Sequence, residues 1–521
     1  MKLPHVLALT ALLIATVQAG QIPVPEGTFG GVPSGSSSGH PTLRQVASPP
    51  FGPAVQRVPN QLRNVVENSG ICETTNGVYQ ASGYGDISED GSIWFWFFAA
   101  RNNPNTAPLA LWFNGGVRAS SMIGLFQEHG PCRINNDSDT VSLNSFSWNE
   151  MANILYIDQP VGVGYSSGNR IIGTSADAAR DIWTFIQVWL SDSRFSKYQN
   201  RDLAIWTESY FLSQNAAIAA GRASGLALNL KMLGIGNGLT APLPQYQGII
   251  NYATNNTYRT FNSTIVACEN NGTDSACSAT QDFCNKNVVD VLADGINIRA
   301  PPVAIINVDG LIFTIYQVYY TPNPSTDPYP RDITTYLASI RSKLNTDGPW
   351  AETKSSVYDN FAASGDWMRD SSVDLETVVN AGVRTLIYDG DADFIVNYQG
   401  VELMLDGLNS KFSDEYRQQS LNDWVVAGQV AGQFKNAGTL SYIRVFGAGH
   451  EVPAYNYGNL SIGQATLQMF SQIMANQSIS NDGSVGSSGN GNKNSAQNTH
   501  LRFSIVASCF LLILLPTWIF L

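Results

Sequence analysis

The sequence predicts an α/β fold with a mainly parallel central sheet, and two observations lead to that prediction. Short apolar runs that end in turn residues recur along the chain, and helical patterns such as 176–190 lie between them. Strands that alternate with helices favour parallel pairing, because each crossover helix returns the chain to the same end of the sheet. Functional side chains of such a sheet lie at the carboxyl ends of its strands. The apolar runs span residues 109–113, 154–157, 203–206, 383–388 and 442–446.

Length and composition set the class of protein. The chain has 521 residues, enough for two modest domains or one large enzyme fold. Hydrophobic residues make up 44% and charged residues 13%, so we expect a sizeable core rather than a disordered or coiled-coil protein. The formal net charge of −12 has the wrong sign for binding a phosphate backbone, which argues against nucleic acid as a partner.

The first 65 residues divide into two segments that precede the folded domain. Residues 1–19 combine Lys2, an apolar stretch and a Val-Gln-Ala ending, which is typical of a cleaved signal peptide. A transmembrane anchor is the alternative, but the apolar stretch is shorter than the roughly 20 residues that span a bilayer. Residues 20–65 are rich in Gly, Pro and Ser without a sustained period, which predicts a flexible leader or propeptide.

Residues 66–478 are expected to form one large domain. Within it, the long stretch 241–377 separates the third predicted strand from the fourth and holds Pro-rich segments, three cysteines and three glycosylation sequons. A connection of this length inside a compact domain usually has a function of its own. We therefore interpret 241–377 as an inserted cap region.

The C-terminal end predicts a lipid anchor. Residues 479–498 form a Gly/Ser/Asn-rich spacer, and residues 499–521 form an apolar tail that stops without charged residues after it. This combination is the signature of a glycosylphosphatidylinositol (GPI) anchor, whose attachment would fall between Ser487 and Ser495, with removal of the tail. A single C-terminal transmembrane helix is the alternative. Both readings place a secreted protein at the cell surface, tethered to the plasma membrane.

Sequons and cysteines fit an oxidising, extracellular compartment. Cys509 lies in the tail, which leaves an odd set of five cysteines. We expect a disulfide between Cys72 and Cys132 and one pair within the cluster 268–284. A zinc site in that cluster is disfavoured by its spacing and by the lack of a nearby His, so no metal is predicted. The six possible glycosylation sites are Asn136, Asn255, Asn262, Asn271, Asn459 and Asn476.

Three residues in a particular chain order predict hydrolytic chemistry. Ser209 follows the run 203–206 and opens an Ala-rich helix expected over 209–221, the strand-turn-helix context of a nucleophile elbow. A Ser that only caps a helix looks the same. Asp393 and His450, however, each lie just past a later apolar run. The order Ser, Asp, His is that of the α/β-hydrolase fold, in which His takes the Ser proton and Asp fixes the His tautomer.

The motifs around these residues closely resemble those of the secreted serine carboxypeptidases, particularly the fungal ones. The likeness runs from about Cys72 to Asn476 and covers most of the mature chain. Six motifs occur in the order of that family, and together they are far more specific than any one alone. They are Leu111–Gly116, Ser120–Cys132, Asp158–Tyr165, Glu208–Tyr210, Gly390–Phe394 and Gly447–Pro453.

The resemblance implies a catalytic triad with Ser209 as nucleophile, Asp393 as acid and His450 as base. Asp389 and Asp391 compete for the acid role on sequence alone and rank below Asp393. No cofactor is implied.

Two further sets of groups follow from the resemblance. Backbone N–H groups would hold the tetrahedral oxyanion, and an Asn with two Glu would bind the free C-terminal carboxylate of a peptide. Buried carboxyls have raised pKa values, so in acid they stay protonated and donate hydrogen bonds to an anion. The oxyanion groups are those of Gly116 and Tyr210, and the carboxylate-binding set is Asn114, Gly115, Glu128 and Glu208.

Three positions depart from the family pattern. The family's nucleophile elbow has a Gly on each side of the Glu-Ser-Tyr sequence, and here these are Thr207 and Phe211. Arg118 replaces a Gly beside the expected oxyanion hole. Bulk at a tight, strained turn is expected to disturb the placement of the nucleophile.

We therefore expect an extracellular serine carboxypeptidase that releases C-terminal residues of peptides and proteins at acidic pH through an acyl-enzyme. The alternative is a catalytically impaired homologue that acts as a tethered surface or binding protein. A lipase or esterase is a more distant possibility, because Asn114, Glu128 and Glu208 suit an anionic substrate end rather than an acyl chain.

Overall fold

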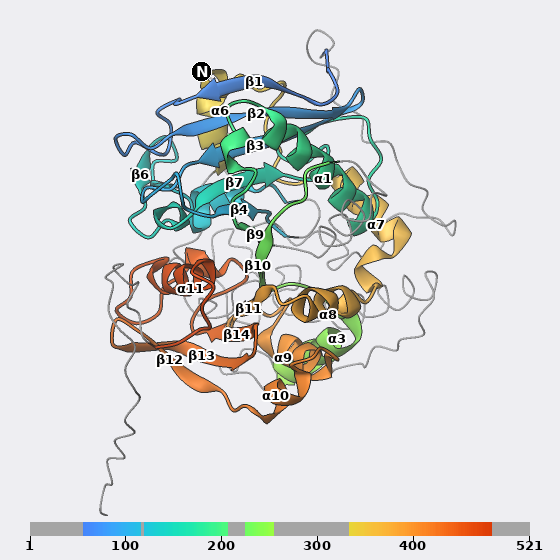
Figure 1. Cartoon of the computed structure of the whole chain (residues 1–521), viewed down its shortest axis with the longest axis vertical. Coiled ribbons are helices and arrows are strands. Elements are labelled where there is room, and N and C mark those ends of the chain that lie inside the picture. Colours follow the sequence, from blue (N-terminus) through green and yellow to red (C-terminus); the bar gives the residue numbers. More distant parts are fainter. Residues whose placement is uncertain (1–55, 116–118, 207–224, 255–332, 482–521) are drawn as a thin grey trace, which may run out of the picture. The chain divides into compact units, whose positions relative to one another are not determined.

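The computed structural model of the protein describes residues 56–115, 119–206, 225–254 and 333–481 (Figure 1). A twelve-stranded sheet runs through this part of the chain in the order β1-β2-β3-β7-β4-β9-β10-β11-β14-β13-β12, with β8 paired to β3. Strands β5 and β6 form a separate two-stranded sheet. The strands of the large sheet are β1 (Gln61–Glu67), β2 (Gln80–Ser88), β3 (Gly91–Phe98), β4 (Leu109–Trp112), β7 (Asn153–Asp158), β8 (Ser167–Gly168), β9 (Leu203–Trp206), β10 (Leu230–Gly236), β11 (Arg384–Gly390), β12 (Asn422–Val426), β13 (Gln429–Ala437) and β14 (Leu440–Val445); β5 is Cys132–Ile134 and β6 is Val141–Leu143.

The central strands β7, β4, β9, β10, β11 and β14 pair in parallel, and the outer strands pair in an antiparallel way. The central strands are short apolar runs with few polar positions. In β9, for example, all four side chains are buried. Such runs are typical of parallel strands that are covered on both faces. The prediction of a mainly parallel central sheet is confirmed.

All five predicted strands are present, and the predicted helix 176–190 is α1 (Ser175–Ser191). The predicted end of the leader at residue 65 is wrong, because β1 begins at Gln61 and pairs with β2. Before β1, the Val58 amide also donates to the carboxylate of Asp86 at 3.0 Å. The sheet therefore starts inside the segment expected to be flexible.

Helices cover both faces of the sheet and enclose two apolar clusters. On one face α1 packs through Ile182, Phe185 and Trp189, and its first turn is capped by the Thr174 side chain, which accepts from the Asp177 amide. The opposite cluster includes the apolar residues of α6 and α11. The remaining helices are α3 (Pro242–Thr254), α6 (Ile333–Leu344), α7 (Ser355–Ser364), α8 (Ser372–Asn380), α9 (Tyr398–Gly407), α10 (Ser413–Gln418) and α11 (Gln464–Met474).

The expected cap region 241–377 begins and ends with helices of the main domain. Figure 1 shows α3 beside α9, near β11. Gly248 of α3 lies so close to Gly400 of α9 that a Cβ atom at Gly248 would collide with the backbone of Gly400. Tyr246 and Tyr252 of α3 belong to the main apolar core. The cap therefore does not start at 241, and residues 255–332 lie outside the described part.

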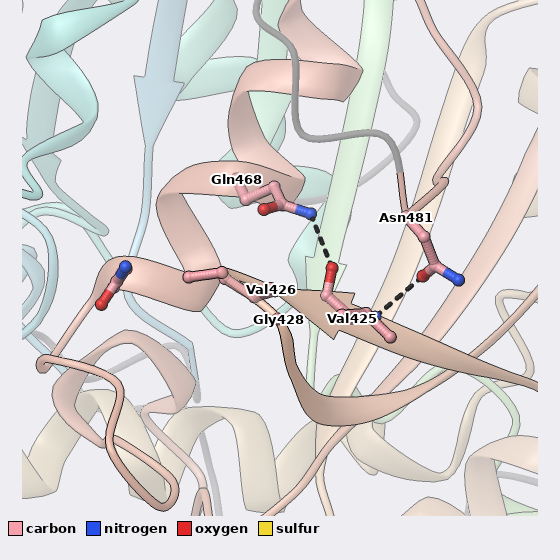
Figure 2. A pocket seen from close by; sticks show the side chains of 7 residues that line it. Val425, Val426, Gly428, Gln468 and Asn481 are labelled. Atoms are coloured by element: carbon pink, nitrogen blue, oxygen red, sulfur yellow. Dashed lines mark hydrogen bonds between the residues drawn. The ribbon is translucent and has the colours of Figure 1, made fainter.

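A shallow pocket of about 420 Å³ lies beside β12, the last strand of the large sheet (Figure 2). On this edge strand, side chains provide hydrogen-bond partners for the backbone amide and carbonyl of Val425. Its amide donates to Asn481 Oδ1 at 2.8 Å, and its carbonyl accepts from Gln468 Nε2 at 3.3 Å. Capping of this kind protects a sheet edge from pairing with another chain. None of the predicted site residues lines this pocket.

The expected signal peptide, spacer, anchor site and tail lie outside the described residues. Within the described ranges, none of the helices has the length and hydropathy of a membrane span.

Candidate active site

Two neighbouring parallel strands bring His450 and Asp393 together. β11 and β14 pair in register, with Gly390 opposite Val445, so the loops that follow them emerge side by side (Figure 1). His450 Nδ1 lies 2.8 Å from Asp393 Oδ2. When Nδ1 donates to the carboxylate, the neutral imidazole presents Nε2 as a proton acceptor. This is the geometry that a general base needs.

The approach of the two loops depends on Gly390, the last residue of β11. A Cβ atom here would collide with the backbone carbonyl oxygens of Ala448 and Gly449, which directly precede His450. Only a glycine permits this contact between the strand end and the His450 loop.

Asp393 is fully buried and accepts several hydrogen bonds that stabilise its negative charge. Its Oδ1 accepts from the Ile395 amide at 3.0 Å. Its Oδ2 accepts from Asn237 Nδ2 at 2.9 Å and from the Val396 amide at 3.3 Å, in addition to His450. The carboxylate is therefore held in one orientation.

The two competing aspartates do not contact His450 in this way. Asp391 Oδ1 accepts from the Gly447 amide at 2.7 Å. Neither carboxyl oxygen of Asp389 has a hydrogen-bond partner, and the side chain is fully buried. Burial, together with the charges of Asp393 and Glu402, raises the pKa of Asp389 well above its usual value, although Tyr442 and the Asn237 amide oppose the shift. Burial therefore favours the neutral form of Asp389, whereas the carboxylate of Asp393 lies beside His450.

Asn237 was not singled out from the sequence, yet it connects three parts of the site. It follows β10 in a left-handed conformation with φ of 42°. Its Oδ1 accepts from the Gly390 amide at 3.1 Å, while its Nδ2 donates to Asp393 and to the Val396 carbonyl. The only signal in the sequence is its place directly after an apolar strand.

Asn237→Ala should lower kcat about tenfold or more and change KM little. The substitution removes a hydrogen bond to a charged carboxylate, which is worth about 1.5–3 kcal/mol, and it frees the loop that carries Asp393. Steady-state kinetics with a peptide substrate, beside a thermal melt, measures the effect. A large rise in KM with unchanged kcat would contradict this role.

Asn114 and Glu128 form a second buried pair. Asn114 follows β4, and Glu128 ends a short π-helix, η1 (Gly124–Glu128). Asn114 Nδ2 donates to Glu128 Oε1 at 2.7 Å, and both side chains are buried. Irregular helices of this type are frequent at functional sites.

The orientation of the Asn114 amide is fixed by two donors to its oxygen. Asn114 Oδ1 accepts from Trp112 Nε1 at 2.6 Å and from the Gly124 amide at 2.9 Å. The amide nitrogen therefore faces Glu128. Gly124 is required here, because a Cβ atom would collide with the Trp112 indole. Trp112 and Gly124 are part of the predicted motifs, but no role was assigned to them.

The loop after Asn114 is held by two serines and a buried aspartate. Ser121 Oγ accepts from the Asn114 amide at 3.1 Å and donates to the Ile157 carbonyl at 2.5 Å. Asp158 Oδ1 accepts from Ser120 Oγ at 2.5 Å and from the Ser121 amide at 2.9 Å. Burial raises the pKa of Asp158 to about 6, against the hydrogen bonds that it accepts. These contacts connect β4 to β7 at the edge of the site.

Burial raises the pKa of Glu128 to about 8. The charge of Glu451 contributes to this rise in the pKa of Glu128, while the hydrogen bond from Asn114 and the charges of His450 and Arg133 oppose it. Glu128 is therefore protonated in acid and can donate a hydrogen bond. On sequence alone, a surface carboxylate is the better interpretation of this residue.

Burial alone would lower the pKa of His450, but the net shift of its pKa is upward. The charge and hydrogen bond of Asp393 raise it, and the charges of Glu451 and Glu128 add to the effect. When Glu128 is protonated, one of these charges is absent, so the pKa of His450 falls. The protonation states of the two groups are therefore linked.

Several predicted residues lie outside the described ranges: Ser209, the helix expected over 209–221, Tyr210, Glu208 and Gly116, together with the departures Thr207, Phe211 and Arg118, the cluster Cys268–Cys284, and the sequons Asn255, Asn262 and Asn271. The described site residues are Asn114, Gly115, Glu128, Asp393 and His450.

The expected disulfide between Cys72 and Cys132 is present, and it ties the first residue of β5 to the segment between β1 and β2. Among the described residues, no group of three or more His, Cys, Asp or Glu side chains could hold a metal ion. Asn136, Asn459 and Asn476 are exposed, as a glycosylation site requires.

Known proteins are similar to this chain in sequence and in fold. The sequence model of the family described as serine carboxypeptidase matches residues 71–476. Carboxypeptidase S1 from Penicillium janthinellum is 38% identical over 434 residues, which cover 80% of this chain and 99% of the relative. Carboxypeptidase Y from Saccharomyces cerevisiae is 31% identical over 422 residues, which cover 75% of this chain and 76% of the relative.

A solved structure shows the same fold. It is a prohormone-processing carboxypeptidase from Saccharomyces cerevisiae, which aligns with a TM-score of 0.60 at 21% identity and covers 78% of this chain and 93% of that chain. Together with the matches in sequence, this likeness confirms the predicted α/β-hydrolase fold. The chain belongs to the serine carboxypeptidase family and is a serine-type hydrolase of that class.

Proposed function

We propose that this chain releases C-terminal amino acids from peptides at acidic pH through an acyl-enzyme, and that Ser209, His450 and Asp393 form its triad. The observation that carries the proposal is the hydrogen bond of 2.8 Å between His450 and the buried Asp393, in the loops that follow two neighbouring parallel strands.

In this mechanism Ser209 attacks the carbonyl carbon of the last peptide bond while His450 Nε2 takes the hydroxyl proton. Asp393 stabilises the imidazolium that forms. Backbone N–H groups of Gly116 and Tyr210 hold the oxyanion. The C–N bond then breaks, His450 gives its proton to the leaving amine, and the acyl group remains on Ser209. Water, activated by His450, attacks the ester and frees the enzyme.

The specificity for a free C-terminus would come from the pair Asn114 and Glu128. With its pKa raised to about 8, Glu128 is protonated in acid and donates a hydrogen bond to the substrate carboxylate. The Asn114 amide, held by Trp112 and Gly124, offers its remaining N–H to the same anion. Glu208 and Gly115 complete the set of carboxylate-binding groups.

We also propose that the mature protein acts outside the cell. Residues 1–19 would direct secretion, the leader that follows would end before β1, and the catalytic domain would run from β1 to about residue 478. The spacer 479–498 would carry a GPI anchor after loss of 499–521. Glycans would be attached at some of the six sequons, of which Asn136, Asn459 and Asn476 are exposed.

The direct test compares an N-blocked dipeptide that has a free C-terminus with the same dipeptide amidated. At acidic pH, the purified protein should release the C-terminal amino acid from the free peptide and cleave the amidated one far more slowly. A fluorophosphonate should label Ser209, and Ser209→Ala should abolish both label and release. Lack of labelling and of release at every pH between acid and neutral would overturn the proposal.

A catalytically impaired surface protein is the second candidate, because Thr207, Phe211 and Arg118 replace glycines of the family pattern. This candidate predicts that the purified protein binds the free dipeptide without cleaving it. The triple variant with Gly at 207, 211 and 118 should then gain activity. Equal rates for the two proteins would argue against local damage by these residues.

A further inference from the structure

Arg133 links the segment that carries Glu128 to the segment that follows His450. It lies on β5, and its Nη1 donates to the Gln127 carbonyl at 2.9 Å, at the end of the π-helix η1. Its Nη2 donates to the Pro453 carbonyl at 3.3 Å, within the short helix η7 (Val452–Ala454). The Arg133 guanidinium therefore fixes the position of Glu128 relative to the loop that carries His450.

Arg133 makes these contacts without a carboxylate partner. Among the described residues Arg133 forms no salt bridge, and its guanidinium donates to two backbone carbonyls. Arg101 shows the usual arrangement, because it also donates to carbonyls but pairs with Glu73 and Glu150 at 2.8 Å each. Removing a cation from water without a counter-charge is costly.

The charge of Arg133 acts on the proposed carboxylate site. Burial lowers the pKa of Arg133 to about 10, and the charges of Glu128 and Tyr156 oppose that shift. The guanidinium is therefore charged at every pH at which the enzyme would work. In return, the Arg133 charge lowers the pKa of Glu128. The two groups lie within electrostatic reach of each other but form no direct ion pair.

We infer that Arg133 is a specificity-determining residue, whose uncompensated positive charge favours substrates that bring a free α-carboxylate to Asn114 and Glu128. The inference rests on the proposed function. With Glu128 protonated, Asn114 and Glu128 supply only neutral donors. The positive potential at this pair then comes from His450 and Arg133, whose charges both lower the pKa of Glu128. The peptide carboxylate would give Arg133 a counter-charge. Arg133 acts through this potential and through the placement of η1, without touching the reacting atoms.

The test measures binding without turnover in the full chain with Ser209→Ala. Calorimetry at acidic pH gives the dissociation constants of an N-blocked dipeptide acid and of its amide. Arg133→Met keeps the aliphatic packing of the side chain but removes the charge and both donors. We expect the acid to bind about tenfold more weakly and the amide less than about twofold more weakly, as removal of one partly buried charge predicts.

Two further variants separate charge from structure. Arg133→Lys keeps the charge and should recover most of the affinity for the acid. Arg384→Met is the matched control. Arg384, at the start of β11, is also partly buried, and within the described part of the chain its partners are the Gly438 carbonyl and the Ser478 hydroxyl. It should leave both dissociation constants unchanged.

The outcomes distinguish the inference from the function on which it rests. If Arg133→Met weakens acid and amide equally, or leaves the acid unaffected, the inference is wrong and the proposed function stands. If the Ser209→Ala parent itself binds the acid no better than the amide, carboxylate recognition fails, and the inference fails with it.

Discussion

Asp393→Asn should lower kcat for peptide hydrolysis about ten-thousand-fold while the fold and KM change little. His450 Nδ1 lies 2.8 Å from Asp393 Oδ2, and the carboxylate accepts the Nδ1 proton. An amide at this position can present its own N–H to the ring. The imidazole would then carry its proton on Nε2, the atom that must accept the proton of Ser209.

The Ile395 amide can still donate to the side-chain oxygen at position 393, since this hydrogen bond requires no negative charge. The Asn237 side chain and the Val396 amide lose their acceptor, because both donate to Oδ2, the atom that the amide nitrogen replaces. A thermal melt is therefore measured beside the rates, and loss of activity in a folded variant reports the tautomer rather than unfolding. Rates from single-turnover and steady-state kinetics measure the effect.

Asp389→Asn is the matched control for that prediction. Asp389 lies four residues earlier in the same segment and is equally buried, and burial raises its pKa, which favours the neutral form. A neutral amide resembles a protonated carboxyl, so this variant should retain activity within about tenfold. If it lost as much activity as Asp393→Asn, the assignment of the acid to Asp393 would be wrong.

The parts of the fold that the sequence could predict are those with a simple pattern. The five strands predicted from the sequence are short apolar runs bounded by turn residues, and α1 has a clear helical period. The sixth parallel strand, β10, was not predicted. β2 was not predicted, because its sequence Gln-Ala-Ser-Gly-Tyr-Gly-Asp-Ile-Ser contains no apolar run, although nearly all of it is buried. Its burial depends on neighbouring strands and on α1, which packs over it. β3 was not predicted either, although its run of apolar and aromatic residues is a pattern that can indicate a buried strand.

The site shows the same limit at the level of single residues. Asp389, Asp391 and Asp393 lie in one short segment, and nothing in their spacing decides which of them meets His450. The decision depends on the register of β11 with β14 and on the close contact at Gly390. Asn237 acts through a left-handed backbone and contacts with a segment more than 150 residues away. Sequence motifs do not encode such contacts.

Glu128→Ala should lower kcat/KM for peptides with a free C-terminus about a hundredfold to a thousandfold, with far less effect on amidated peptides. The substitution removes the proposed donor to the substrate carboxylate and leaves Asn114 Nδ2 without its partner at 2.7 Å. A hydrogen bond to a charged group is worth about 1.5–3 kcal/mol, and loss of the partner's orientation adds to this cost. Equal losses for the free and the amidated peptide would contradict the role in recognition.

Glu128→Gln separates the shape of this side chain from its charge. Its amide oxygen can accept from Asn114, and its amide nitrogen can donate to the substrate anion, so activity in acid should remain close to that of the parent. In the parent, Glu128 loses its proton as the pH rises through its pKa of about 8. The carboxylate then repels the substrate anion and can no longer donate to it.

The parent's kcat/KM should therefore fall as the pH rises through about 8, and in Glu128→Gln this fall should disappear or move to higher pH. Profiles of kcat/KM from about pH 4 to about pH 9 report these free-enzyme groups. If the alkaline limb stays in place in Glu128→Gln, another group limits activity at high pH. Carboxylate recognition by a protonated Glu128 would then be wrong.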